Sequence, residues 1–238
     1  MKKLFNMPGR LLLCGLALSV AALAFTSCTK TGDDYEQPPV AGFMAFNLAP
    51  DKPGVGFALS GSRLSNTPLG FTNYTGTYLP VYTGSREVAA FDFNDGSTLA
   101  TNTFTFEDSS YYSAFLVGVN GYYRNVIVKD DLVPITPVSG KAWVRYINAV
   151  ADTAARPSIT IGGNTSSAVA FGTVSGFEQV NAGDLALAID GESSFNVNRS
   201  ITVEENKIYT ILFTGQPGQV NPSLAVQIKF IQNGTATH

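Results

Sequence analysis

The apolar residues of this chain alternate with polar or small ones at a period of two. Leu185, Leu187 and Ile189 are separated by smaller residues, and the run 226–230 shows the same alternation. A period of two places alternate side chains on one face of an extended strand, as a half-buried strand requires. After Phe25 the sequence has no apolar stripe at helical spacing. The pattern therefore predicts an all-β protein.

Two segments have apolar residues at both odd and even positions, which predicts central strands. They are Lys207 to Phe213, after its first residue, and Ser110 to Val117. Strands of this kind are covered on both faces. Between the predicted strands lie dipeptides that accept the positive φ of tight turns. These dipeptides are Asp95-Gly96, Asn120-Gly121, Gly162-Gly163, Asp190-Gly191 and Asn233-Gly234.

The chain contains two copies of one domain-length pattern. At an offset of 97 residues, the matched positions are Phe106-Glu107-Asp108 with Val203-Glu204-Glu205, Tyr112 with Tyr209 and Gly118 with Gly215. Asn47 and Asp51 match Asn148 and Asp152 at an offset of 101. We place the copies at 41–131 and 141–238, joined by a linker, 132–140, whose prolines break any strand. About seven short strands per copy predict two tandem immunoglobulin-like β-sandwich domains.

The second copy contains segments that resemble a known family. They are Val144-Arg145-Tyr146-Ile147-Asn148-Ala149, Val169 to Phe177, Ala182-Gly183 and Val203 to Tyr209. Together they are similar to an uncharacterised domain, DUF4397, which recurs in tandem in bacterial exported proteins and lipoproteins. The resemblance covers most of 142–216 and, more loosely, 43–118. It implies the sandwich fold and brings no established activity with it.

Residues 1–27 have the layout of a secretory signal peptide. Lys2, Lys3 and Arg10 precede an apolar run from Leu11 to Phe25. That run is 15 residues long, which is shorter than the roughly 20 residues that a membrane-spanning helix needs. We therefore expect this segment to be removed after export.

The residues Phe25-Thr26-Ser27-Cys28 resemble the lipobox of bacterial lipoproteins, although Phe25 stands where that group usually has Leu, Val or Ile. The resemblance implies lipid attachment at Cys28, and a plain signal peptide with an unmodified cysteine is the alternative. Residues 28–40 then form a lipidated, acidic tether that ends in two prolines. Its acids resemble surface-sorting stretches, with ordinary solvated charges as the alternative. We expect an outer membrane lipoprotein of a Gram-negative bacterium, exposed at the surface or facing the periplasm.

Composition narrows the range of functions. The formal net charge is −3, and removing the three cations of residues 1–27 leaves −6, which disfavours nucleic acid as a partner. The only histidine is His238, and the only cysteines are Cys14 and Cys28. A Ser-His or Cys-His nucleophile and a zinc site of the usual type are therefore not expected. Phosphate-binding glycine motifs are also missing from the sequence. We expect no enzyme activity, no catalytic residue, no cofactor and no metal.

Tyrosines are the best candidates for binding a partner. Tyr74, Tyr78 and Tyr82 are spaced by four in a segment expected to be extended, so they are expected to share one face. A second group is expected around the next hairpin and contains Tyr111, Tyr112, Tyr122 and Tyr123. Such flat aromatic area suits a glycan or protein partner at the cell surface. The alternative is that these tyrosines fill the core and the strand edges.

Carboxylates suggest two other functions that the sequence leaves open. A glycan hydrolase with acids such as Asp92 or Glu107 would need two carboxyl groups roughly 5 to 10 Å apart. Both acids, however, lie in segments that also suit turns, Asp92 before Asp95-Gly96 and Glu107 beside a predicted hairpin. The preferred hypothesis is a non-enzymatic binding, adhesion or scaffold module at the cell envelope. The hydrolase and a fimbria-like structural subunit are the alternatives.

Overall fold

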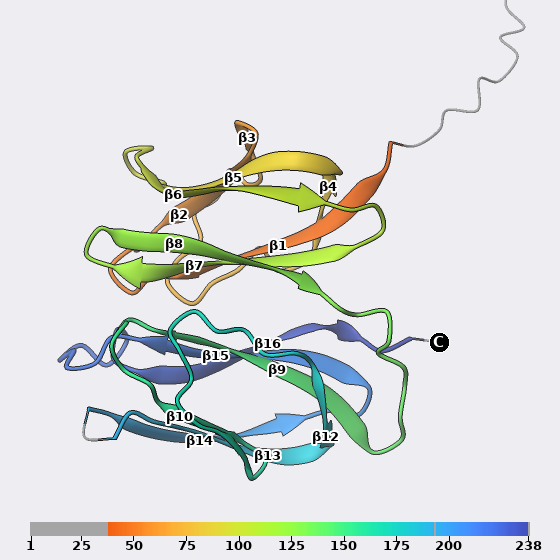
Figure 1. Ribbon diagram of the computed structural model, residues 1–238, viewed down its shortest axis with the longest axis vertical. Helices are drawn as coiled ribbons and strands as arrows, with labels where there is room; N and C mark the ends of the chain where they lie inside the picture. The colour runs from red at the N-terminus through yellow and green to blue at the C-terminus, as the bar shows by residue number, and fades with distance from the viewer. Residues whose placement is uncertain (1–37, 193, 238) are drawn as a thin grey trace, which may run out of the picture. The chain divides into compact units, whose positions relative to one another are not determined.

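The computed structural model describes residues 38–192 and 194–237. Within these residues the chain forms sixteen β-strands and no helix, which confirms the all-β prediction (Figure 1). Accordingly, this part of the chain contains no helix long and apolar enough to span a membrane. The predicted signal peptide and the lipid attachment at Cys28 fall in residues 1–37, outside the described residues.

The first sandwich consists of two four-stranded sheets. Sheet A has the order β4-β1-β7-β8, and sheet B has the order β3-β2-β5-β6. The strands are β1 (Val40–Leu48), β2 (Val55–Leu59), β3 (Ser62–Arg63), β4 (Leu79–Tyr82), β5 (Gly84–Asp92), β6 (Thr98–Phe106), β7 (Tyr111–Val119) and β8 (Tyr122–Asp130). Phe43, Phe106 and Tyr112 are among the largest buried side chains between these two sheets.

The second sandwich is built in the same way. Sheet C has the order β12-β9-β15-β16, and sheet D has the order β11-β10-β13-β14. The strands are β9 (Lys141–Val150), β10 (Ser158–Ile161), β11 (Asn164–Ser166), β12 (Glu178–Asn181), β13 (Gly183–Asp190), β14 (Asn196–Val203), β15 (Lys207–Gly215) and β16 (Gln227–Thr235). Each sandwich therefore has eight strands, rather than about seven. The alternating residues Leu185, Leu187 and Ile189 are all buried in its core.

The two sandwiches repeat the same strand pairing. In each, the first strand pairs in parallel with the seventh, β1 with β7 and β9 with β15. The Tyr112 hydroxyl accepts a hydrogen bond from the Glu107 amide at 3.0 Å, and the Tyr209 hydroxyl accepts one from the Glu204 amide at 3.1 Å. The offset of 97 residues therefore marks structurally equivalent positions.

Glu107-Asp108 and Glu204-Glu205 lie at exposed turns, as predicted, but the hairpins predicted beside them are wrong, and so is the turn predicted at Asn233-Gly234. Glu107-Asp108 and Glu204-Glu205 do not lie in hairpins, because the strands on either side of each pair belong to different sheets. They lie instead on connections from one sheet to the other. Asn233-Gly234 lies inside β16, where the pairing register shifts and leaves Asn233 as the extra residue of a β-bulge. An Asn-Gly pair suits a bulge as well as a turn, since both interrupt regular pairing.

A third hydrophobic cluster lies between sheet A and sheet C, where the two sandwiches meet. It contains Phe46 and Phe115 of the first sandwich and Ile147 and Leu212 of the second, all fully buried. We call it the junction core. The junction core explains why the central strands carry apolar residues on both faces. One face of each strand packs inside its own sandwich, and the other face packs in the junction core.

The connection 132–140 also packs against the second sandwich. Ile135 is only 4% exposed and clusters with Ile208, Ala236 and the partly buried Trp143. Its prolines keep the segment out of the sheets, as expected. The segment is nevertheless a packed part of the structure and not merely a spacer.

Candidate functional site

A buried ion pair joins the two sandwiches. Asp130 is the last residue of β8, and Arg145 lies in β9. Arg145 Nη1 donates to Asp130 Oδ1 at 2.5 Å, and the two side chains are 2% (Arg145) and 0% (Asp130) exposed. The guanidinium also lies over the Phe177 ring, 4.5 Å from its centroid. Burying two charges costs several kcal/mol per ion, so such a pair requires that the remaining polar atoms are also bonded.

Two hydroxyl groups of the first sandwich complete the bonding of the carboxylate. Tyr78 Oη and Ser113 Oγ donate to Asp130 Oδ2 at 2.5 and 2.6 Å. Ser113 Oγ in turn accepts a bond from Arg145 Nη2 at 2.8 Å. Each oxygen of the carboxylate is therefore bonded, as a buried charge requires.

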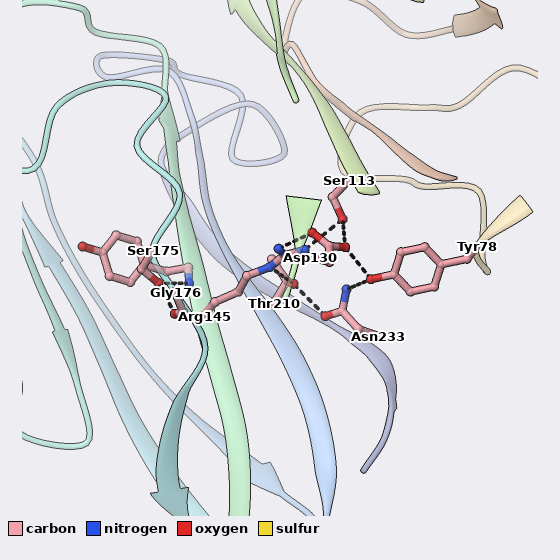
Figure 2. A network of polar contacts seen from close by, with 9 residues as sticks. Tyr78, Ser113, Asp130, Arg145, Ser175, Gly176, Thr210 and Asn233 are labelled. Atoms are coloured by element: carbon pink, nitrogen blue, oxygen red, sulfur yellow. Dashed lines mark hydrogen bonds and ion pairs between the residues drawn. The ribbon is translucent and has the colours of Figure 1, made fainter. Parts of the chain in front are cut away.

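The second sandwich closes these contacts into a ring. Arg145 Nε donates to Thr210 Oγ1 at 3.0 Å, and Thr210 donates to Asn233 Oδ1 at 2.6 Å. Asn233 Nδ2 then makes a longer contact of 3.4 Å with the Tyr78 hydroxyl, which leads back to Asp130. Figure 2 shows this ring. We call the six residues Tyr78, Ser113, Asp130, Arg145, Thr210 and Asn233 the junction network.

The network holds Tyr78 in its protonated form. Burial, together with the neighbouring Asp130 carboxylate, raises the pKa of Tyr78 well above its ordinary value. The physical reason is that an ionised phenol there would be a desolvated negative charge beside another negative charge. Tyr78 therefore acts as a hydrogen-bond donor throughout the neutral pH range.

A cleft of about 590 Å³ lies beside the junction network, and we call it the junction cleft. It is lined by Tyr78, Ile135, Ile208 and the segments 109–111, 129–133 and 233–237. Tyr78, Asp130 and Asn233 belong to both the cleft and the network, so the network fixes part of the cleft wall. The volume lies within the roughly 300 to 1,000 Å³ that is usual for small-molecule sites.

The three tyrosines of the first predicted group differ in their contacts and exposure. Tyr74 stacks on Phe46 at the edge of the junction core, with ring centroids 5.4 Å apart. Tyr78 belongs to the junction network, and Tyr82 is exposed at the end of β4. Because Tyr74 pairs with Phe46 and Tyr82 with Val40 on β1, and Tyr78 packs against the junction core, all three lie on the same face of sheet A, as their spacing predicts. Of the three, Tyr78 is the one that lines the junction cleft.

The second tyrosine group is divided between the two ends of a hairpin. In the β7–β8 hairpin, Tyr111 pairs with Asp130 at one end and Val119 pairs with Tyr122 at the other. Strand geometry places these ends roughly 27 Å apart. The expected cluster is therefore wrong: Tyr111 lines the junction cleft, whereas Tyr122 is 87% exposed at the far end. Beside it, the Tyr123 hydroxyl donates to Asp51 at 2.5 Å.

The carboxylates considered for catalysis lie far apart. Asp92 ends β5 and pairs with Lys52 at 3.1 Å, while Glu107 follows β6 and pairs with Lys129 at 2.5 Å. Because β6 runs antiparallel along β5, Asp92 and Glu107 lie at opposite ends of β5, roughly 26 Å apart. They do not form a pair at the roughly 5 to 10 Å that glycoside hydrolysis uses.

Asp92 and Asp95 instead stabilise the β5–β6 turn. The Asn94 amide donates to Asp92 Oδ1 at 3.0 Å, and the Ser97 amide donates to Asp95 Oδ1 at 2.8 Å. Hydrogen bonding to the Asn94 amide lowers the pKa of Asp92 below its ordinary value, and hydrogen bonding to the side chain and backbone of Ser97 does the same for the pKa of Asp95. Among the described residues, no group of three or more His, Cys, Asp or Glu side chains is placed to hold a metal ion.

One sequence feature outside the predicted site residues does indicate the network. Arg145 lies in a strand in which the residues before and after it are apolar at both odd and even positions. A lone cation in such a strand predicts a buried anionic partner, since unpaired charges are rarely buried. The partner itself, Asp130, ends a half-exposed strand in the other copy, and the local sequence gave no sign of its burial.

Comparisons with known proteins identify the family. A family model described as a domain of unknown function, DUF4397, matches residues 43–155 and 142–235. No curated protein matches the chain. A solved structure described as "Alpha-glucan binding by a streptococcal virulence factor" is 12% identical, with coverage of 81% of this chain and 97% of that chain and a TM-score of 0.25. A similarity of that size supports no argument about function. The two family matches span most of the chain, which therefore belongs to the DUF4397 family.

Proposed function

We propose that this protein is a lipid-anchored, extracytoplasmic binding module of the cell envelope, and that its ligand binds in the junction cleft. The observation that carries this proposal is the sharing of Tyr78, Asp130 and Asn233 between the cleft and the junction network. Because these walls are held in place before binding, the protein loses less conformational entropy when a ligand binds. A concave site with fixed walls is therefore suited to specific binding.

The polar nature of the network supports the same proposal. Well-packed apolar residues often stabilise a protein as much as a buried ion pair does. A ring of directional hydrogen bonds, however, defines one orientation of its partners, which apolar contacts alone do not. Here the partners come from both sandwiches, so the network sets the geometry of the cleft between them.

The location at the envelope rests on the N-terminal sequence. The lipobox-like residues before Cys28 support acylation of that cysteine. Each buried methylene of an acyl chain contributes about 0.8 kcal/mol to membrane binding, so the several chains of a lipoprotein anchor give stable attachment. The attached sandwiches would then face the periplasm or the cell exterior.

Two observations favour binding over the alternatives. The separation of Asp92 from Glu107 argues against a hydrolase that uses this pair. A fimbria-like subunit would need a displaced or donated strand, whereas the two described sandwiches have the same eight-strand arrangement and neither lacks a strand that the other has.

Metabolic labelling tests the anchor. Cells that express the wild-type protein or the Cys28→Ala variant are grown with a radiolabelled fatty acid. The wild-type protein is expected to incorporate label and to remain with the membrane fraction, while the variant does neither. Equal labelling of the two proteins, or an uncleaved leader found by mass spectrometry, would contradict the proposed anchor.

Hydrogen exchange tests the site without assuming a ligand class. Purified mature protein is incubated with a detergent-solubilised envelope extract, and amide protection is compared with that in buffer. Protection is expected at 109–111 and 233–237, on two walls of the junction cleft. The matched control region is the β7–β8 turn around Tyr122, which is exposed but distant from the cleft. Protection absent from the cleft, or confined to that turn, would overturn the proposed site.

A further inference from the structure

The junction cleft carries an exposed aromatic ring that neighbouring residues hold in place. Tyr111 is 44% exposed and lies edge-on to Tyr78, with ring centroids 5.0 Å apart. Gly42 of β1 allows the ring to lie close, since a Cβ there would stand 2.5 Å from Tyr111 Cδ1. Because Tyr78 is itself bonded to Asp130, Tyr111 offers the cleft a flat apolar surface in a fixed orientation.

The hydroxyl groups of the cleft offer both acceptors and donors. Ser109 Oγ donates to the Asp108 carboxylate at 3.2 Å, and Ser110 Oγ donates to the Asp108 carbonyl at 3.3 Å. Both serine oxygens keep lone pairs that can accept. Thr235 Oγ1 accepts from Lys207 Nζ at 3.0 Å, a bond that does not use its own proton. A ligand whose groups both donate and accept fits this set.

The cleft carries little net charge. Lys129 is paired with Glu107, and the charge of Asp130 is neutralised by Arg145. Of the charged side chains that line the cleft, this leaves the exposed carboxylate of Asp131. One negative charge disfavours an anion, and because it is exposed to water it attracts a cation only weakly, so a neutral ligand is favoured.

Apolar side chains lie beside these polar groups. Leu132, Val133 and Ile135 line the cleft along the connection between the sandwiches. A ligand is therefore expected to combine apolar C–H surfaces with hydroxyl groups. Sugar rings have this combination, because their faces carry C–H groups and their edges carry hydroxyls that donate and accept.

We infer that the junction cleft binds a neutral saccharide, with one sugar ring stacked on Tyr111 and its hydroxyls bonded to Ser109, Ser110 and Thr235. The inference rests on the proposed function and names the ligand class of the same site.

Isothermal titration calorimetry of the mature protein tests this inference, with short neutral gluco-, manno- and galacto-oligosaccharides as probes. At least one probe is expected to bind. The Tyr111→Ala variant is expected to bind it at least about tenfold more weakly, because the stacking surface is lost. Tyr111→Phe keeps the ring and is expected to retain most of the affinity. Tyr122→Ala is the matched control, since it removes a more exposed tyrosine far from the cleft, and its affinity is expected to equal that of the wild type.

The outcomes separate the ligand class from the proposed function. If no saccharide binds while the envelope extract still protects the cleft, the ligand class is wrong and the binding function stands. If neither is observed, both are wrong. Saccharide binding that is lost in Tyr122→Ala and kept in Tyr111→Ala would move the site to the other end of the sandwich. Circular dichroism spectra of each variant establish that it is folded.

Discussion

The polar side chains at the junction act as one group. Two routes of hydrogen bonds lead from Arg145 to Asp130, one through Ser113 and the other through Thr210, Asn233 and Tyr78. The hydroxyl groups along these routes both donate and accept, so each bond polarises the next. The cost of a substitution therefore depends mainly on which buried group it leaves without a partner.

Replacing Arg145, the cation of the buried pair, tests this dependence most directly. Arg145→Met leaves Asp130 as an uncompensated buried charge and is expected to lower the free energy of unfolding by about 3–5 kcal/mol. The double variant Arg145→Met/Asp130→Leu removes both charges and is expected to recover much of that loss. Guanidinium-induced unfolding measures the changes.

The exposed Lys129–Glu107 pair provides the control for this experiment. Lys129→Met breaks an ion pair at the surface and is expected to leave stability almost unchanged. If Arg145→Met were as stable as Lys129→Met, the buried pair would have no structural role.

The raised pKa of Tyr78 predicts how the stability of the protein changes at alkaline pH. Its pKa in the folded state is raised above the unfolded value of about 10. The folded state therefore holds this proton more tightly, so the stabilisation is complete below pH of about 10 and is lost as the pH rises further. Urea unfolding at pH of about 8 and about 11 is expected to show a smaller alkaline loss for Tyr78→Phe than for the wild type. Ser113→Ala removes a network hydroxyl that does not titrate in this range and is expected to keep the wild-type loss.

At the scale of strands and turns, local sequence predicted much of the structure but could not separate a turn from a bulge. Asn120-Gly121 forms a tight turn with φ values of +56° and +85°. Asn233-Gly234 has the same residue types yet lies within β16, because the pairing partner β15 continues past it. The deciding contacts lie in another strand, and a local pattern does not contain them.

The candidate site was less predictable than the fold for the same reason. The alternating pattern and the repeat offset each describe one copy, so they predict the sandwiches well. The junction cleft combines residues from separate parts of the chain between 78 and 237, and the contact between Tyr78 and Asn233 spans 155 residues. The face through which the two copies meet determines these contacts, and the pattern of one copy alone does not contain them.

The connection between the copies has a stability consequence of its own. Ile135→Ala is expected to lower the free energy of unfolding by about 2–5 kcal/mol, since it leaves a cavity in a packed cluster. Val133→Ala, two residues away, is the matched control, because Val133 is 90% exposed and its truncation removes little packing. Equal stability of the two variants in chemical unfolding would show that this segment is only a spacer.

At the scale of the whole molecule, the junction core makes the two sandwiches depend on each other. Separating them would expose the fully buried faces that contain Phe46, Phe115, Ile147 and Leu212. It would also break the ion pair between Asp130 and Arg145. Both effects oppose a state in which one sandwich is unfolded while the other remains intact.

Scanning calorimetry is therefore expected to show one cooperative transition with equal calorimetric and van't Hoff enthalpies. Leu212→Asp, which places a charge in the junction core, is expected to split this into two transitions at lower temperature. Glu107→Asp, an exposed change away from that core, serves as the control and keeps one transition. Two separate transitions in the wild-type protein would contradict the dependence.

The two copies meet through the same face. Phe46 and Ile147 occupy equivalent repeat positions, as do Phe115 and Leu212, and all four lie between sheets A and C. This is the geometry of a two-fold symmetric dimer joined into one polypeptide. In a homodimer every substitution appears on both sides of the axis, whereas a fused pair can change one side alone. Met44 and Arg145 occupy one such equivalent position with unlike residues. Because the two copies share one chain, the face through which they meet can carry an ion pair that is contributed unequally by the two sides.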